Sequence, residues 1–354
     1  MILHSRLRTL SCAFAVFALA ACGGHTQEKL TELPPPAPAQ PQPLPPVQPE
    51  TLSAFTLWVE DFKQEALSKG VSQEVLDNAF AHVKEPSPKV LELDHTQPEQ
   101  TKSFDEYVSG FLKPARIDAA HAQWQSHAEL LDKVHKAYDV PIPILLALWQ
   151  VESRFGAHQG SYSIVQALTT LAYDGRRSQF FRKQLLDAMT ILQQEHMDAA
   201  NLTGSWAGAM GQVQFMPSSY LSFAVDFDGD GRKNIWTSDA DAAASMANYL
   251  HTKGWDPHKG WGMRVRLPEG GVSAICEDSK AYQPIKAWQK LGLRAYNGAK
   301  LPKRLADTRL VMPDNKPENA YLVTSNYDVI MDWNHSTYFA TAIGLLADAD
   351  AASR

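Results

Sequence analysis

One carboxylate, Glu152, lies near the end of a strongly apolar stretch, ALWQVESRFG at residues 147–156. Residues 144–151 are nearly all apolar, and Glu152 follows Leu148 by four positions, so both share one helical face. Burial among apolar side chains disfavours the charged carboxylate and raises its pKa. A glutamate that keeps its proton near neutral pH suits general acid catalysis. The alternative is a solvated glutamate, or one paired with the nearby Arg154.

A second stretch, GSWAGAMGQVQFMPSSYLSF at residues 204–223, crowds glycines and alanines into a short segment. Helix propensity is poor there, so the small residues predict a close approach of the backbone to a neighbour or a ligand. Gln212 and Gln214 are amides that could bond a sugar hydroxyl or acetamido group. Pro217 marks the start of a new helix.

A third stretch, DFDGDGRKNIWTSDAD at residues 226–241, begins like a calcium-binding loop. The aspartates at positions 1, 3 and 5 of that pattern are Asp226, Asp228 and Asp230. Position 12 should be a bidentate glutamate and is Thr237, so Asp239 or Asp241 would have to supply the missing oxygens. The alternative is an acidic turn that orders itself without metal, through side-chain bonds to its own backbone.

The elements that position these stretches are mostly helical in the first half of the globular sequence. Apolar residues recur at helical spacing from Leu52 onward, which predicts helices over 103–113 and 118–138. A further helix is expected from about Pro143 to Gly156, because proline fits a first helical turn and glycine favours the position after the last.

Strand-like patterns appear after residue 262. The alternating stretches are 263–267, 308–312 and 320–325. They predict a small β-containing insert over about 262–331, followed by a helix over 332–349 with Asn334 as its polar start signal. The fold class expected for residues 52–350 is therefore mainly α (α+β).

The first residues resemble an export signal. Two arginines precede an apolar run that is too short to cross a bilayer and ends in Leu-Ala-Ala-Cys22. This pattern predicts a lipoprotein signal peptide at residues 1–21 and lipidation of Cys22; the alternative is an ordinary cleaved signal. Gly23 stands where, by analogy with lipoprotein sorting, an aspartate would retain the protein in the inner membrane, so we expect the periplasmic face of the outer membrane.

A proline-rich linker follows at residues 22–51, and at ~3.1 Å per residue it could reach roughly 80–90 Å. Of the three cysteines, only Cys276 remains free once Cys12 is removed with the signal and Cys22 carries lipid. No internal disulfide is therefore expected.

Several function classes are disfavoured by the composition. The net charge is −6 and no basic block occurs, so nucleic acid is not an expected partner. The sequence also has no dinucleotide-binding or phosphate-binding glycine loop, no HExxH zinc helix and no G-x-S-x-G nucleophile elbow.

With these motifs in view, the chain resembles the B family of membrane-bound lytic murein transglycosylases, of the lysozyme-like superfamily. The resemblance runs from about Leu52 to Asp350. Its motifs, in order, are ALWQVESRFG, QALTTLAYDGRR, GSWAGAMGQVQFMPSSY, DFDGDGRKNIW, MANYLHTKGW and NYDVIMDWNHSTYFA. It implies a lysozyme-like helical core with a further α-helical part and a small β subdomain, acting on peptidoglycan glycan strands.

The resemblance also implies roles for particular residues. By position, Glu152 matches the family's single catalytic acid/base. The implied substrate-binding residues are Ser205, Gln214, Tyr107, Tyr249 and Asn334. Where the family usually has a tyrosine this chain has Phe339, so either Tyr338 takes over that role or a hydroxyl is missing from the cleft. The family has an EF-hand-like site, and Asp241 matches its late aspartate across a one-residue insertion.

The function implied is non-hydrolytic cleavage of the MurNAc-GlcNAc β-1,4 bond, which leaves 1,6-anhydro-MurNAc ends. No cofactor is required, a structural Ca²⁺ is an open question, and other cell-wall enzymes are conceivable partners besides the outer membrane. The alternatives are a hydrolytic muramidase and a catalytically inactive tether that binds peptidoglycan. The site motifs offer no convincing second carboxylate, which a two-carboxylate glycosidase would need.

Overall fold

The computed structural model describes residues 52–96, 102–269, 281–302, 305 and 307–352. These residues fall in the unit Thr51–Arg354. The predicted signal peptide, the lipidated Cys22, the linker at 22–51 and Cys276 lie outside the described residues. Within the described part of the chain, no helix is both long enough and apolar enough to cross a membrane.

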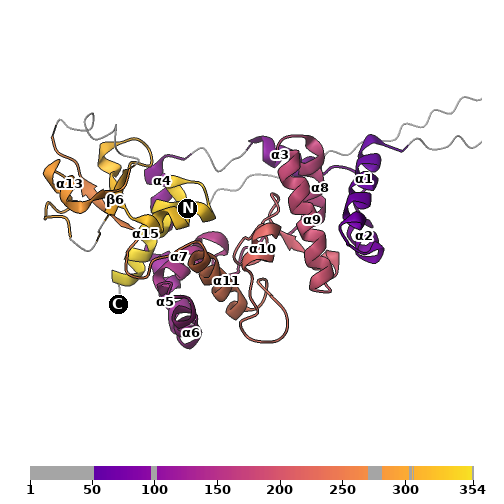
Figure 1. The fold of residues 1–354 in the computed structure, drawn as a ribbon, viewed down its shortest axis with the longest axis horizontal. Coiled ribbons are helices and arrows are strands. Elements are labelled where there is room, and N and C mark those ends of the chain that lie inside the picture. Colours follow the sequence, from indigo (N-terminus) through magenta and orange to yellow (C-terminus); the bar gives the residue numbers. More distant parts are fainter. Residues whose placement is uncertain (1–51, 97–101, 270–280, 303–304, 306, 353–354) are drawn as a thin grey trace, which may run out of the picture. The chain divides into compact units, whose positions relative to one another are not determined.

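Helices dominate the fold, as the sequence predicts (Figure 1). The helices that precede the predicted β insert in the sequence are α1 (Ala54–Ser68), α2 (Gln73–Phe80), α3 (Pro88–Thr96), α4 (Phe104–Phe111), α5 (Pro114–Ser126), α6 (Ala128–Tyr138), α7 (Ile142–Ser153), α8 (Ile164–Asp174), α9 (Ser178–Gln194), α10 (Pro217–Phe223) and α11 (Asp239–Thr252). The chain ends with α14 (Ser325–Trp333) and α15 (Thr337–Ala352) among the described residues. Two short strands far apart in the sequence, β1 (Tyr162–Ser163) and β2 (Thr203–Gly204), pair antiparallel and join the segment after α7 to the small-residue segment.

Helix α7 is buried on every side, as its apolar sequence predicts. It packs against α15, α5, α6 and α11, and its residues Leu145 to Trp149 have no exposed surface. The helix begins at Ile142, directly after Pro141, and Pro143 lies in its first turn, where proline is tolerated. It ends at Ser153, three residues before the predicted stop at Gly156. A tight left-handed turn follows, because Arg154, Phe155 and Gly156 have φ values of 50°, 57° and 83°.

The predicted β-containing insert is present as a five-stranded sheet with the order β4-β6-β7-β3-β5. Its strands are β3 (Gly262–Arg266), β4 (Gln283–Pro284), β5 (Arg294–Ala295), β6 (Asp307–Val311) and β7 (Tyr321–Val323), and the short helix α13 (Ile285–Lys290) covers it. The last residues of the predicted insert belong instead to α14. The sheet has a small core of its own, built around Trp288.

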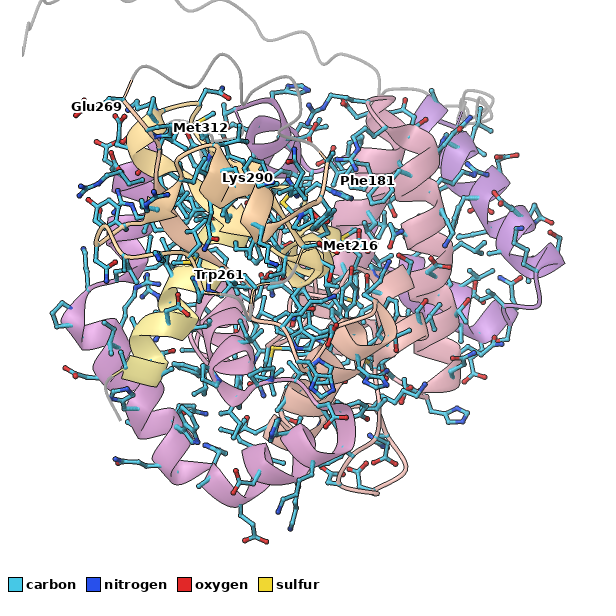
Figure 2. All side chains as sticks on the ribbon, turned by 60° about the vertical axis from the view of Figure 1, so that its left-hand side comes forward. Phe181, Met216, Trp261, Glu269, Lys290 and Met312 are labelled. Atoms are coloured by element: carbon cyan, nitrogen blue, oxygen red, sulfur yellow. The ribbon has the colours of Figure 1, made fainter. Side chains whose placement is uncertain are left out.

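Trp261 joins this insert to the helices (Figure 2). Its ring belongs to the main core, and its carbonyl accepts a bond from Thr324 N just after β7. A Cβ at position 344 of α15 would lie 2.2 Å from this ring, so the ring needs Gly344. The insert is thereby fixed to the helix that packs on α7.

Two predicted helices are divided in the structure. Residues 118–138 belong to α5 and α6, because His127 both ends α5 and starts α6 through its backbone bonds to Gln123 O and Leu131 N. The predicted helix over 332–349 starts only at Thr337. Asn334 is extended and ends α14, so it is a stop signal there and not the start that we predicted.

Candidate active site

Glu152 lies at the end of α7 and is half-buried. Its Oε1 accepts a hydrogen bond of 2.7 Å from the indole Nε1 of Trp333, the last residue of α14. The Trp333 ring in turn contacts Phe215 and Tyr249, with centroid distances of 5.3 and 4.8 Å. We call these three side chains the aromatic cluster. Trp333 supplies the donor to the carboxylate, and the other two rings pack against Trp333.

The pKa of Glu152 is raised to about 7, chiefly because burial penalises the carboxylate. The Trp333 hydrogen bond acts in the opposite direction, since an N–H donor stabilises the charged form. The raised pKa predicted from the apolar helix is thus confirmed. The alternative pairing with Arg154 is not seen, because Arg154 Nη1 lies 3.1 Å from His158 Nε2 and no described residue forms an ion pair with Glu152.

A buried chain of hydrogen bonds supports this end of α7. Trp149 Nε1 donates to Gln212 Oε1 at 2.8 Å, and Gln212 Nε2 donates to Asp239 Oδ1 at 3.0 Å. The other oxygen of Asp239 lies 2.9 Å from His127 Nε2. Both ends of the Gln212 amide are therefore engaged with protein. Of the two amides that could bond a sugar, Gln212 instead joins helix α7 to α11.

Gln214 has a left-handed backbone, with φ of 51°. Its Nε2 donates to the carbonyls of Gln159 and Gly211 at 3.0 and 2.8 Å. With both N–H bonds directed to backbone, the amide orientation is fixed and its oxygen is the acceptor left for a ligand. Ser205 Oγ accepts from Ala209 N at 3.0 Å, which leaves the hydroxyl proton available as a donor.

The small residues near Ser205 and Gln214 let neighbouring backbone segments come close together, as the sequence predicts. A Cβ on Gly204 would lie 2.1 Å from the carbonyl oxygen of Ala209. A Cβ on Gly160 would lie 2.2 Å from the carbonyl oxygen of Gly204, and Gly160 also has a φ of +85°. Strand β2 and the segment after α7 therefore touch through glycine.

The aromatic residues expected in the cleft fall into two places. Tyr249 belongs to the aromatic cluster, and its hydroxyl donates to the Asp332 carbonyl at 2.7 Å. Tyr107 of α4 lies against Tyr338 at the start of α15, with ring centroids 5.9 Å apart. Phe339 is buried, whereas Tyr338 is half-buried. Asn334 is exposed and directly follows Trp333 in the sequence.

The three aspartates of the acidic loop come together. Ligand oxygens of Asp226, Asp228 and Asp230 lie within 4.8 Å of one another, and all three residues are exposed. Asp226 also accepts backbone N–H bonds of 2.7 and 2.8 Å from Gly229 and Gly231. These bonds are what the metal-free acidic turn predicts, and they also orient the carboxylates toward a common point.

Asp241 has other partners. It is fully buried, and its oxygens accept 2.7 Å bonds from the backbone N–H groups of Phe227 and Asn234. Among the described residues, the group of mutually close ligand atoms does not include Asp241. Asp241 therefore ties the beginning of the loop to its end.

Two functional candidates were missed by the sequence reasoning. Trp333, the donor to Glu152, stands directly before Asn334 in the motif DWNHS, so its position in that motif was the available signal. Gln159 carries the carbonyl that orients Gln214, and nothing in its surrounding sequence marks that role.

Comparison with known proteins identifies the family of the chain. A family model described as Transglycosylase SLT domain matches residues 54–348. Membrane-bound lytic murein transglycosylase B of Escherichia coli (strain K12) is 32% identical over 249 residues, which cover 70% of this chain and 67% of that protein.

Solved structures agree as well. SltB3 from Pseudomonas aeruginosa in complex with NAG-anhNAM-pentapeptide superposes with a TM-score of 0.79 at 41% identity, over 84% of this chain and 79% of that chain. Escherichia coli lytic transglycosylase Slt35 in complex with calcium gives a TM-score of 0.72 at 29% identity, over 84% of this chain and 93% of that chain. From the match over most of its length and the shared fold, the chain belongs to the family of lysozyme-like lytic transglycosylases with a Transglycosylase SLT domain.

Proposed function

We propose that this lytic transglycosylase cleaves the MurNAc-GlcNAc β-1,4 bond of peptidoglycan with Glu152 as its single acid and base. The observation that carries the proposal is the half-buried Glu152, whose pKa of about 7 leaves it largely protonated in mildly acidic solution and able both to give and to take a proton near neutral pH. The SltB3 structure supports the substrate class, because its ligand contains both sugars and a pentapeptide. Ser205, Gln214, Tyr107, Tyr249, Asn334 and Tyr338 are the proposed substrate-binding residues.

The hydrogen bonds and ion pairs of the described residues join no second carboxylate to Glu152, which is compatible with a mechanism that uses one carboxylate. The acidic residue next to its donor is Asp332, and the Asp332 carboxylate lies 3.5 Å from Lys253 Nζ. No described acidic residue shares a hydrogen bond with Glu152. A two-carboxylate hydrolase would need a second carboxyl group within about 5–9.5 Å of the first, across the scissile bond.

The reaction begins with proton transfer. Protonated Glu152 gives its proton to the glycosidic oxygen, the bond from that oxygen to C1 of MurNAc breaks, and its electron pair stays on the departing GlcNAc oxygen. The acetamido carbonyl of the same MurNAc stabilises the electron-deficient C1. Trp333 lies against the carboxylate and packs on the other rings of the aromatic cluster, and such apolar surroundings disfavour entry of water.

Ring closure completes the cycle. The Glu152 carboxylate takes the proton from the C6 hydroxyl of MurNAc, and O6 forms the new bond to C1. Glu152 is then protonated again, as at the start. No water is consumed, so the new end is a 1,6-anhydro-MurNAc.

The product ends test this proposal. Purified murein digested with the protein should release fragments whose MurNAc ends are lighter by one water than those from a hydrolase. Reducing MurNAc ends as the main product would identify a hydrolytic muramidase. Intact murein after digestion, with the protein bound to it, would identify an inactive tether.

We further propose that Cys22 anchors the protein in the outer membrane through covalent lipid, with residues 22–51 as a spacer. The lipoprotein-like signal and the printed description of the Escherichia coli relative as membrane-bound support this location. Cys22→Ala should move the protein from the membrane to the soluble fraction, because the described residues contain no helix that could hold it there. Fractionation of cells in high salt measures this. Retention of the variant in outer membranes would show that something other than Cys22 holds it.

We propose in addition that Asp226, Asp228 and Asp230 hold a structural calcium ion. Three exposed carboxylates within 4.8 Å of one another fit a hard cation with oxygen ligands, and the Slt35 structure is a calcium complex. A bound ion would neutralise like charges that otherwise repel each other. Its chemistry is structural, and no catalytic step passes through it.

Calcium should therefore raise the melting temperature. A ligand at 100 times its Kd stabilises the folded state by about 2.7 kcal/mol, which corresponds to roughly 5 °C for a domain of this size. Asp228→Ala should abolish the increase, whereas Asp132→Ala, which removes an exposed aspartate of α6, should preserve it. Melting curves in 10 mM calcium and in chelator decide the matter, and identical curves for the unchanged protein would favour the metal-free turn.

A further inference from the structure

The turn that follows α7, residues 154–160, has an unusual backbone. It begins two residues after Glu152, and several of its residues are left-handed, with φ between 50° and 85°: Arg154, Phe155, Gly156 and Gly160. Residues that carry a Cβ, such as Arg154 and Phe155, rarely adopt this conformation. A turn of this kind keeps its shape only where contacts with the surrounding structure hold it.

The same turn presses against the small-residue segment at two points. A Cβ on Gly156 would lie 2.7 Å from Gln212 Oε1, and a Cβ on Gly160 would lie 2.7 Å from Ser205 N. Glycine removes both obstacles and also accepts the positive φ at these positions. A shift of the turn would therefore be transmitted to the segment that carries Ser205 and Gln214.

Gln159 closes this turn. From its half-buried side chain, Nε2 donates to Gly156 O at 3.0 Å, within the turn, and to Trp236 O at 2.9 Å, near the end of the acidic loop. Its own backbone carbonyl accepts the 3.0 Å bond from Gln214 Nε2. Gln159 is thus held in place through its side chain, and it holds the Gln214 amide through its backbone.

Trp236 is a firm anchor for the Gln159 side chain. Its indole Nε1 donates to Thr203 O at 3.1 Å, and the carbonyl of the preceding residue, Ile235, accepts a 2.9 Å bond from Gln212 N. The end of the acidic loop is therefore fixed to the small-residue segment without Gln159. The Gln159 side chain adds the turn after α7 to this fixed unit.

We propose that Gln159 is a positioning residue for glycan binding: its side chain fixes the backbone carbonyl that makes the Gln214 amide offer its oxygen to the substrate. This inference rests on the proposed function, in which Gln214 contacts the glycan, and Gln159 acts through Gln214. Any residue at position 159 supplies a carbonyl, but the glutamine side chain determines where that carbonyl lies. Without it the Gln214 amide can rotate, and its NH₂ group then replaces the acceptor that a sugar hydroxyl or acetamido N–H needs.

The loss should appear in substrate binding. A hydrogen bond from a sugar substituent to Gln214 is made before and during cleavage alike, so its loss raises KM and leaves kcat nearly unchanged. Gln159→Met keeps the length of the side chain and removes both donated bonds. On soluble, uncrosslinked murein strands this variant should raise KM about fivefold, the effect of one hydrogen bond, and change kcat by less than about twofold.

A double-mutant cycle with Gln214 tests the path of this effect. Gln214→Ala should raise KM at least as much as Gln159→Met. Because Gln159 acts through Gln214, the double variant should have the KM of Gln214→Ala alone, within about twofold. A double variant in which the two single effects multiply would overturn the proposal, and so would a wild-type KM in Gln159→Met. If the methionine variant does not fold, Gln159→Ala, which adds no bulk, takes its place in the cycle.

A second glutamine provides the matched control. Gln193, near the end of α9, is also half-buried and also joins two segments: its Nε2 donates to Gly70 O at 3.1 Å, and its Oε1 accepts from Ser72 N at 2.7 Å. Gln193→Met removes these bonds far along the chain from the site and should keep the wild-type KM. An increase in KM equal to that of Gln159→Met would show that loosened structure alone weakens binding, and would contradict the proposal.

The same experiment separates this inference from the proposed function. A wild-type KM in Gln214→Ala would remove Gln214 from the substrate contacts, and the positioning role of Gln159 with it. Multiplying effects in the cycle would reject the role of Gln159 alone. The new ends formed in these digests test the proposed chemistry, because reducing ends would reject it whatever the KM values.

Discussion

Glu152→Gln is expected to reduce the turnover of murein by about 10³-fold or more, because general acid and base catalysis together rest on this one side chain. The amide keeps the shape of the carboxyl group but can neither donate a proton to the glycosidic oxygen nor accept one from the C6 hydroxyl. The measurement is the rate of formation of new glycan ends on purified murein. Activity within tenfold of wild type in a folded variant would remove Glu152 from the mechanism.

The fold of this variant should be intact, and the pH dependence of its stability provides a check. Burial raises the folded-state pKa of Glu152 to about 7 from the 4.5 expected in an unfolded chain. The stability that Glu152 contributes is therefore fully present below about pH 4.5 and is lost as the pH rises through 7. Relative to wild type, Glu152→Gln should become more stable over that window. Glu74→Gln, at an exposed glutamate of α2, should show neither effect.

Trp333→Phe should shift the pH profile of the reaction. The Trp333 hydrogen bond stabilises the Glu152 carboxylate, so its removal raises the pKa of Glu152 further above 7. The basic limb of kcat/KM, which follows the loss of the catalytic proton, should move to higher pH by about one unit. At the optimum kcat should fall about tenfold, because the carboxylate loses the donor that orients it.

A matched tryptophan separates this effect from general loss of packing. Trp255 is buried, and its indole N–H has no hydrogen-bond partner in the described structure. Trp255→Phe makes the same chemical change without removing a bond and should leave the pH profile in place. A profile of Trp333→Phe that coincides with wild type would contradict the assigned role of the indole.

The features that the sequence predicted best are those fixed by neighbouring residues. Helix α7, its burial and the raised pKa of Glu152 all follow from one continuous apolar segment. The mainly α fold and the β insert follow from changes in residue periodicity. The close contact of Gly204 with Ala209 also had a local signal, the cluster of small residues in 204–223.

What the sequence did not reveal depends on contacts between distant segments. Trp333 is 181 positions from Glu152, and no local pattern shows that its indole reaches that carboxylate. The role of Gln212 could not be predicted because a buried amide and a ligand-binding amide look alike in sequence. Its partners Trp149 and Asp239 stand 63 and 27 positions away. The break at Asn334 was missed because a polar residue can end a helix as well as start one.

The fate of water tests the central claim most directly. Murein is digested in water enriched in ¹⁸O, and the new MurNAc ends are weighed by mass spectrometry. If Glu152 transfers a proton and the C6 hydroxyl closes the ring, the new ends carry no ¹⁸O and have the mass of anhydro-MurNAc. One ¹⁸O atom at each new MurNAc end would show that water attacks C1, and would contradict the mechanism.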